Sequence, residues 1–186
     1  MKHSISYYLG NTLIVLSVLG FAFIFYPLIR LYLFPPHISP IASKHGLFIT
    51  IPKISAQAPV ITGVDPFDAR QYMAALKKGI AQAKGTSLPG EKGTIYLFAH
   101  SSGPPWELTR YNTIFLRIGE LKRGDKVILT RNGKNYTYLV RDKKTIWPSN
   151  LSYLKNTART QLILQTCTPI GTDFQRLLVF ADPARN

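Results

Sequence analysis

Two apolar, β-rich runs joined by a short loop restrict the fold of this chain more than any other feature. The first run, 159–167, ends in the only cysteine, Cys167, and the second, 176–180, opens with Arg176. The loop between them carries Pro, Gly and Asp, which connect paired strands. The pattern predicts a hairpin that brings the Cys167 thiol and the Arg176 guanidinium to the same end of a sheet. A cation beside a thiol favours the thiolate, the form that attacks carbonyl carbons.

Further short β-rich runs precede this hairpin, and an Asn-Gly pair at 132–133 marks a turn between two of them. The predicted strands are 47–54, 59–64, 93–100, 126–131 and 135–140, with 143–147 extending the sheet. Seven or eight short strands predict an all-β sandwich or a closed barrel. Residues 47–186 are long enough to form one such core.

One helix is expected inside this domain, with a connector at 107–123 that contains a short helical turn. Asp65 is placed to cap the helix, Pro66 suits its first position, and Gly85 suits its end. Apolar residues recur on one face at helical spacing. They are Phe67, Met73, Leu76, Ile80 and Ala83.

The N-terminal stretch has a different character, since residues 3–29 contain no Asp, Glu, Lys or Arg. An apolar run of this length spans a bilayer core of about 30 Å as a helix. A cleaved signal peptide has an apolar region of only about 7–15 residues, so a retained anchor over 1–34 is the favoured reading. Residues 35–46, rich in Pro and Ser, form an expected linker. The Lys/Arg distribution does not fix which side of the membrane the domain occupies.

His100 ends the predicted strand 93–100 and is followed by Ser, Gly and Pro, which are typical of loops. It is therefore expected at the mouth of the sheet. The other histidines, His3, His37 and His45, lie in the N-terminal tail or the linker region and are weaker candidates for an acid or base.

The formal net charge of +14 predicts an anionic neighbour such as lipid head groups, cell-wall polymer or nucleic acid, without choosing among them. A single cysteine excludes an internal disulfide and any multi-cysteine zinc site. The sequence shows no Gly-rich phosphate loop and no pair of carboxylates suited to acid–base catalysis.

The order of histidine, Thr-Cys and arginine, each at a strand end, resembles the sortases. Residues 164–169, Leu-Gln-Thr-Cys-Thr-Pro, are similar to the family's Thr-Leu-x-Thr-Cys strand. Residues 98–100 and 176–179 resemble its histidine and arginine strands, and the similarity extends over about 47–183. Ile163 stands where the family often has Thr, and Ala99 where many members have Gly.

The resemblance implies an eight-stranded barrel and a membrane-anchored cysteine transpeptidase whose catalytic domain is extracytoplasmic. Such enzymes cut a Leu-Pro-x-Thr-Gly-type sorting signal and join it to an amine of cell wall or pilin. It implies Cys167 as nucleophile, His100 as acid and base, Arg176 as oxyanion and peptide donor, and Thr166 in substrate binding. It implies no cofactor, no metal and no nucleic-acid partner, and the membrane is contacted through residues 7–29.

An alternative stays open from the residues alone. An anchored, non-enzymatic β-barrel would bind nucleic acid or an anionic wall polymer through its basic face, because residues 122–144 hold eight Lys and Arg against two Asp. Salt-sensitive binding that is indifferent to Cys167→Ala would support this alternative.

Overall fold

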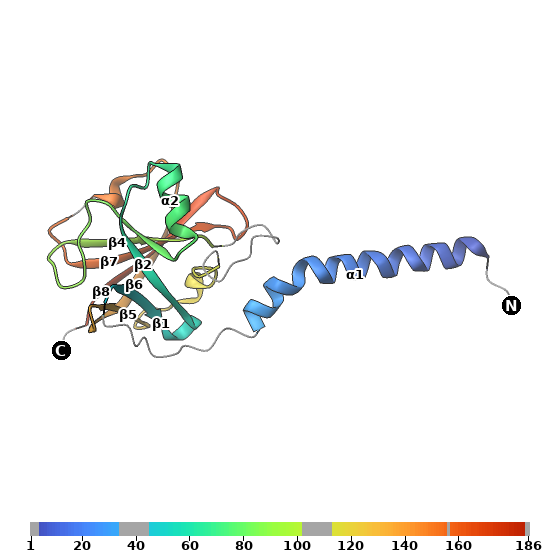
Figure 1. The fold of residues 1–186 in the computed structure, drawn as a ribbon, viewed down its shortest axis with the longest axis horizontal. Coiled ribbons are helices and arrows are strands. Elements are labelled where there is room, and N and C mark those ends of the chain that lie inside the picture. The colour runs from blue at the N-terminus through green and yellow to red at the C-terminus, as the bar shows by residue number, and fades with distance from the viewer. Residues whose placement is uncertain (1–3, 34–44, 102–112, 156, 185–186) are drawn as a thin grey trace. The chain divides into compact units, whose positions relative to one another are not determined.

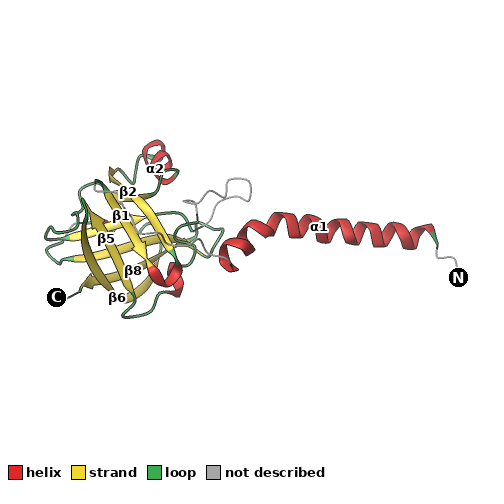
Figure 2. Cartoon of the chain, turned by 60° about the horizontal axis from the view of Figure 1, so that its bottom comes forward, coloured by secondary structure: helices red, strands yellow, loops and turns green. Residues whose placement is uncertain are grey.

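A computed structural model describes residues 4–33, 45–101, 113–155 and 157–184. The chain divides into two compact units, Met1–Pro35 and Pro36–Asn186. The first consists of a helix and the second of a barrel with short helices at its periphery (Figures 1 and 2).

Helix α1 (Ile5–Leu33) fits the charge-free N-terminal run. Its segment Ile5–Tyr26 is long and apolar enough to cross a membrane, a property shared by membrane anchors and signal sequences. Apolar side chains along this segment are exposed. The expected linker, 35–46, lies outside the described residues except for its last two positions.

Eight strands close into a barrel in the order β1-β2-β3-β4-β7-β8-β6-β5, which confirms the closed eight-stranded fold. Two neighbouring pairs, β2–β3 and β4–β7, are parallel, and the others are antiparallel. Closure pairs the edges that an open sheet would expose. The strands are β1 (Leu47–Ile51), β2 (Ala56–Val64), β3 (Ile80–Ala83), β4 (Thr94–Phe98), β5 (Lys126–Arg131), β6 (Lys134–Ile146), β7 (Gln161–Thr168) and β8 (Gln175–Pro183).

The barrel is filled by aliphatic and aromatic side chains from its strands, and their burial is the main favourable contribution to folding. The largest fully buried ones are Tyr96, Phe115, Ile49, Ile51, Ile80, Ile95, Leu97, Ile118, Leu121, Leu129, Leu162 and Ile163. Phe115 and Ile118 come from the connector after β4, where a 3₁₀ turn (Ile118–Glu120) fits the predicted helical turn. Residues 107–112 of that connector lie outside the described residues.

The helix predicted over 65–85 is wrong in extent. Helix α2 (Ala69–Leu76) is only a fragment of it and is capped by Asp68, whose carboxylate accepts from the backbone N–H groups of Arg70 and Gln71. Phe67 and Met73, expected in the core, are 71% and 42% exposed.

Ile80 and Ala83, expected on that helix, instead belong to strand β3. A Cβ atom at Gly79 would lie 2.2 Å from the Pro59 carbonyl oxygen, so only glycine lets the chain approach β2 this closely. Residues 80–83 form a strand between β2 and β4 because a closed barrel requires every strand edge to be paired. The spacing of apolar residues in the sequence does not contain this requirement.

The remaining boundaries differ modestly from the predicted ones. The runs 135–140 and 143–147 form one strand, β6, with a register shift after Val140. The first predicted strand, 47–54, ends at Ile51 because a 3₁₀ turn begins at Pro52. The turn at 132–133 joins β5 to β6, and both of its residues have positive φ, as a tight hairpin requires.

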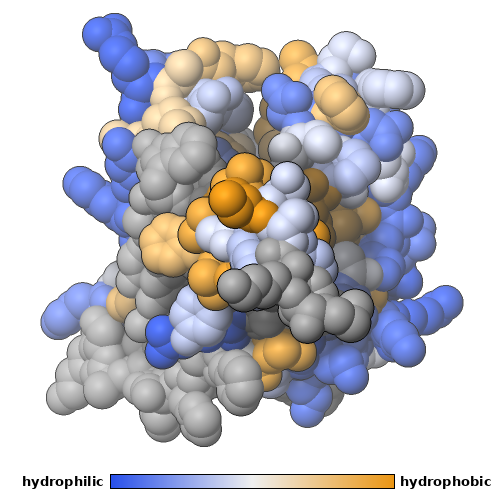
Figure 3. Space-filling view, turned by 90° about the vertical axis from the view of Figure 1, so that its right-hand side faces the viewer, coloured by the Kyte–Doolittle hydropathy of each residue, from blue (hydrophilic) through white to orange (hydrophobic). Residues whose placement is uncertain are grey.

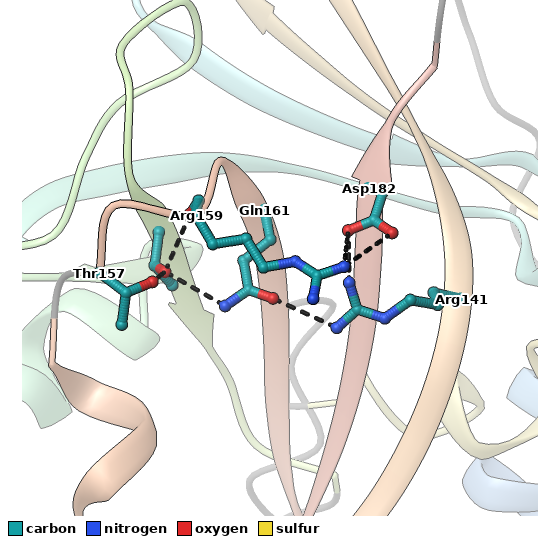
Figure 4. A network of polar contacts seen from close by, with 6 residues as sticks. Arg141, Thr157, Arg159, Gln161 and Asp182 are labelled. Atoms are coloured by element: carbon teal, nitrogen blue, oxygen red, sulfur yellow. Dashed lines mark hydrogen bonds and ion pairs between the residues drawn. The ribbon is translucent and has the colours of Figure 1, made fainter.

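A polar network connects the strands that carry the site, at the end of β7 opposite to Cys167 (Figure 4). Asp182 on β8 accepts from Arg141 on β6 and from Arg159, which precedes β7. Gln161 accepts from Arg141 at 3.3 Å and donates to Thr94 on β4 at 3.3 Å. The network ties β4, β6, β7 and β8 together without involving the site residues.

The surface of the molecule is mixed. Figure 3 shows both hydrophilic and hydrophobic side chains exposed to solvent. Four large apolar residues in the connections after β6 and β7 are exposed by 47–67%. They are Trp147, Leu151, Ile170 and Phe174.

Candidate active site

The predicted hairpin is confirmed, and it places Cys167 directly beside Arg176. Strands β7 and β8 are antiparallel, and these two residues are paired across them. Side chains of paired residues lie on the same face of a sheet, about 5 Å apart at Cβ. Both residues are partly exposed, so the thiol and the guanidinium are accessible from solvent.

His100 reaches the other side of Cys167 through the parallel pair β4–β7. The register joins Thr94 to Gln161 and continues to Phe98 and Gln165. It persists beyond β4, because the Ala99 N–H donates to the Gln165 carbonyl at 3.1 Å. Extending this register past the end of β4 at Phe98 predicts His100 opposite Cys167, at the usual strand spacing of about 4.8 Å. The thiol is thus paired with a guanidinium on β8, and on its other side the segment just after β4 leads to the imidazole of His100.

Thr166 faces away from the thiol, since successive side chains on a strand alternate between its faces. It is 4% exposed, and its hydroxyl donates to the Ala99 carbonyl at 3.0 Å. This hydrogen bond joins β7 to the residue immediately before His100. Thr166 is therefore placed to hold the backbone immediately before His100 in position.

The guanidinium of Arg176 is held by the backbone of its own loop. Its Nη1 donates to the carbonyls of Asp173 at 2.8 Å and Gln175 at 3.2 Å. Within the described part of the chain, Nη2 and Nε have no acceptor, and they stay available for a ligand. The donor geometry of arginine suits two acceptors at once.

Burial dominates the electrostatics of the thiol and the imidazole. Burial raises the pKa of Cys167, Arg176 lowers it, and Asp173 raises it further, with a net upward shift. The predicted effect of the arginine is present, but desolvation of the anion outweighs it. Burial likewise lowers the pKa of His100. At neutral pH the free site therefore favours a neutral thiol and a neutral imidazole.

Sequence reasoning missed a polar pair beside the thiol. The Tyr96 hydroxyl donates to Oε1 of Gln165 at 2.5 Å. Gln165 is two positions before Cys167, so it shares the face of the thiol. The sequence did carry a signal for this pair. A glutamine stands inside an otherwise apolar run, two positions from the cysteine, where strand alternation puts both side chains on the same face.

The candidate site contains no evident metal centre. In the part of the chain that the structure describes, no group of three or more His, Cys, Asp or Glu could hold a metal ion. Its reactive groups are a thiol, an imidazole and a guanidinium.

The fold and the candidate site define a class: closed β-barrels in which a strand-end cysteine is paired with an arginine on the next strand, with a histidine just beyond the end of the strand on its other side. The chain belongs to the sortase family, because the sortase domain matches residues 49–184.

Individual relatives agree with this membership. The chain is 29% identical over 136 residues to sortase D of Bacillus subtilis (strain 168), covering 71% of this chain and 60% of that protein. Sortase A from Corynebacterium diphtheriae, in a lid mutant, has a TM-score of 0.63 and 26% identity, over 79% of this chain and 75% of that one. A Clostridium perfringens sortase C structure with the C-terminal cell wall sorting motif has a TM-score of 0.61 and 31% identity, over 75% and 70% of the chains. The chain thus spans less than two thirds of the length of the curated relative.

Proposed function

We propose that this protein is a membrane-anchored cysteine transpeptidase that cleaves a C-terminal sorting signal of the Leu-Pro-x-Thr-Gly type. It then transfers the new carboxyl to an amine of a cell-wall precursor or a pilin. The observation that carries the proposal is the pairing of Cys167 with Arg176 on β7 and β8, together with the β4–β7 register that leads to His100 just beyond the end of β4. Family membership supports it, as does the sorting motif named for the Clostridium perfringens sortase C structure.

The first half of the reaction forms an acyl-enzyme. His100 first accepts the thiol proton of Cys167, and the resulting thiolate attacks the carbonyl carbon of the substrate threonine. The Thr–Gly bond breaks after a tetrahedral intermediate. His100 gives a proton to the departing glycine amine. The Nη2 and Nε groups of Arg176, which have no acceptor among the described residues, stabilise the oxyanion and hold the peptide. The product of this half is a thioester on Cys167.

The second half transfers the acyl group. An incoming amine attacks the thioester carbonyl, His100 accepts the proton of that amine, and the Cys167 thiolate leaves. Water in place of the amine gives hydrolysis. Thr166 supports both halves by holding the backbone before His100, and its predicted part in substrate binding stays a prediction.

Helix α1 supports the anchoring part of the proposal, since it is long and apolar enough to cross a membrane. The barrel is proposed to lie on the extracytoplasmic side, where sorting signals and wall precursors meet. The proposed domain division is 1–34 for the anchor, 35–46 for the linker and 47–186 for the catalytic barrel.

The test is single-turnover acylation of the full chain in detergent by a library of Leu-Pro-x-Thr-Gly-like peptides, read by intact mass and repeated with added amines. We expect a thioester adduct on the wild type and none on Cys167→Ala. His100→Ala should lose turnover, whereas His45→Ala, at an exposed position near the start of the barrel, should keep it. If no peptide acylates the wild type, the transpeptidase proposal fails.

A further inference from the structure

The Tyr96–Gln165 pair is a polar contact in a largely apolar part of the sheet. Tyr96 is 1% exposed, and its hydroxyl donates to the Gln165 carboxamide oxygen across β4 and β7. Gln165 itself is only partly buried. Tyr96 is therefore fixed in the protein interior, whereas part of Gln165 is exposed to solvent.

Gln165 lies on the same face of the sheet as the proposed catalytic groups. Gln165 is paired with Leu178 on β8. This pair is two residues along the strands from the Cys167–Arg176 pair. Two residues of a strand span about 6.6 Å, and a bound extended peptide advances by the same amount over two residues. A peptide whose scissile carbonyl is at Cys167, aligned with β7, has a residue over Gln165.

The orientation of the Gln165 amide is set by its partner. Oε1 accepts from the Tyr96 hydroxyl, so the Nε2 amide group is turned the other way. Among the described residues, no group accepts a hydrogen bond from Nε2. Phe98 and Leu178, paired with Gln165 on either side, are buried and apolar. The Gln165 amide N–H groups therefore have no hydrogen-bond acceptor among the described residues, and the side chains beside them are apolar.

The positive charge of Arg176 adds an independent link between this pair and the site. Burial raises the pKa of Tyr96, and the charge of Arg176 acts in the opposite direction. The tyrosine is consequently a neutral donor at all physiological pH values and lies within electrostatic reach of the same arginine that affects Cys167.

We propose that Gln165 is a specificity-determining residue whose Nε2 donates to an oxygen acceptor in a substrate side chain about two positions from the scissile bond, and that Tyr96 is the positioning residue that fixes its amide. The proposal rests on the transpeptidase function above. A site with a fixed donor prefers a substrate that accepts, because a substrate lacking the acceptor leaves the donor unpaired. The substrate class is then a sorting peptide with Thr, Ser, Asn or Gln at that position.

The experiment compares peptide preference in the full chain in detergent. A library that varies each position within three residues of the scissile bond is used for single-turnover acylation of the wild type, Gln165→Met and Tyr96→Phe. We expect the Gln165→Met variant to lose about tenfold in kcat/KM for the best polar peptide and to prefer an apolar residue there. Tyr96→Phe should reduce the same preference by a smaller factor, in KM more than in kcat.

Two matched controls separate recognition from structure. Gln161→Met removes a glutamine on the same face of β7 whose amide is occupied by Arg141 and Thr94. Tyr138→Phe removes a hydroxyl from another buried tyrosine, which is 3% exposed on β6. Both controls should change the melting temperature without changing the preferred peptide.

The outcomes are distinct. An unchanged preference in both Gln165→Met and Tyr96→Phe, with or without a lower rate, overturns the proposal. If Gln165→Met lacks a cooperative melt, the Tyr96→Phe preference decides alone. A wild type that no peptide acylates overturns the transpeptidase function instead, whereas an acylated wild type with unaltered variants overturns only this inference.

Discussion

The thiol of Cys167 is subject to two opposing influences, and the balance predicts how it reacts. Burial raises its pKa and the Arg176 cation lowers it, with burial stronger. Alkylation requires the thiolate, so a raised pKa means that the reaction is slow at neutral pH and accelerates only at higher pH.

We expect the pH midpoint of Cys167 alkylation by iodoacetamide to lie above that of an unperturbed cysteine thiol. Arg176→Ala should move this midpoint still higher, because it removes the influence that lowers the pKa. The measurement is the labelling rate against pH, followed by intact mass. A wild-type midpoint near neutrality, or a lower one in Arg176→Ala, would contradict this account.

At Arg176 the geometry of the donors matters as well as the charge. Nη1 is already held by the carbonyls of Asp173 and Gln175, which fixes the plane of the guanidinium. Lysine keeps the charge but has a point donor on a flexible stem. We expect Arg176→Lys to lower the acylation rate by about 10²–10³, the effect of losing one oxyanion donor, and Arg176→Ala to lower it more.

Single-turnover acylation of Cys167, read by intact mass, tests this prediction. Iodoacetamide labelling serves as the control, because Arg176→Lys should keep the thiol reactive. If Arg176→Lys acylated at the wild-type rate, the contribution of Arg176 would be its positive charge alone and not the geometry of its donors.

Among the elements, the parallel pair β4–β7 determines the site most directly. The β7–β8 hairpin brings Cys167 to Arg176 through a short loop, but only β4–β7 brings His100 across. The last contact before His100 is the hydrogen bond from Thr166 to the Ala99 carbonyl.

We expect Thr166→Val to lower the free energy of unfolding by about 1–2 kcal/mol, since it leaves a buried carbonyl without its donor. It should also slow acylation without slowing alkylation, because His100 is displaced while Cys167 is not. Urea denaturation and the two labelling rates measure these effects. The control is Thr145→Val at an exposed position of β6, where a change within about 0.5 kcal/mol is expected. Equal losses in both variants would contradict the positioning role.

At the scale of the whole molecule, the two units have separate physical requirements. Buried apolar residues within the described chain begin at Leu47 and end at Ala181, so the barrel has its own core. The apolar side chains over Ile5–Tyr26 of α1 are exposed instead, and the proposed anchor would cover them with a membrane or with detergent.

We expect a chain that begins at Leu47 to fold cooperatively in detergent-free buffer, with the same melting temperature as the barrel of the full chain in detergent. The full chain should aggregate when detergent is removed. Differential scanning calorimetry and light scattering test both parts. A shortened chain without a cooperative transition would show that the domain boundary is misplaced.

The sequence by itself determined the features that depend on local pattern. The charge-free run of 3–29 predicts a long apolar helix because helix length follows from an uninterrupted apolar stretch. The turn at 132–133 and the Cys167–Arg176 hairpin were also predictable, since turn chemistry and alternation act between residues close in the chain. Family resemblance then supplied the closed barrel and the candidate triad.

Only the tertiary structure decided what depends on pairing between distant segments. The run at 80–83 forms β3 because a gap between β2 and β4 must be paired, although its spacing also fits a helix. The segment that ends in His100 is brought alongside β7 by a parallel register that joins residues 67 apart, as in the Thr166–Ala99 contact. The upward pKa shift of Cys167 and the Tyr96–Gln165 contact depend on burial, which no single run encodes. Local sequence sets each strand, whereas the closed sheet sets which strands meet and how much water reaches them.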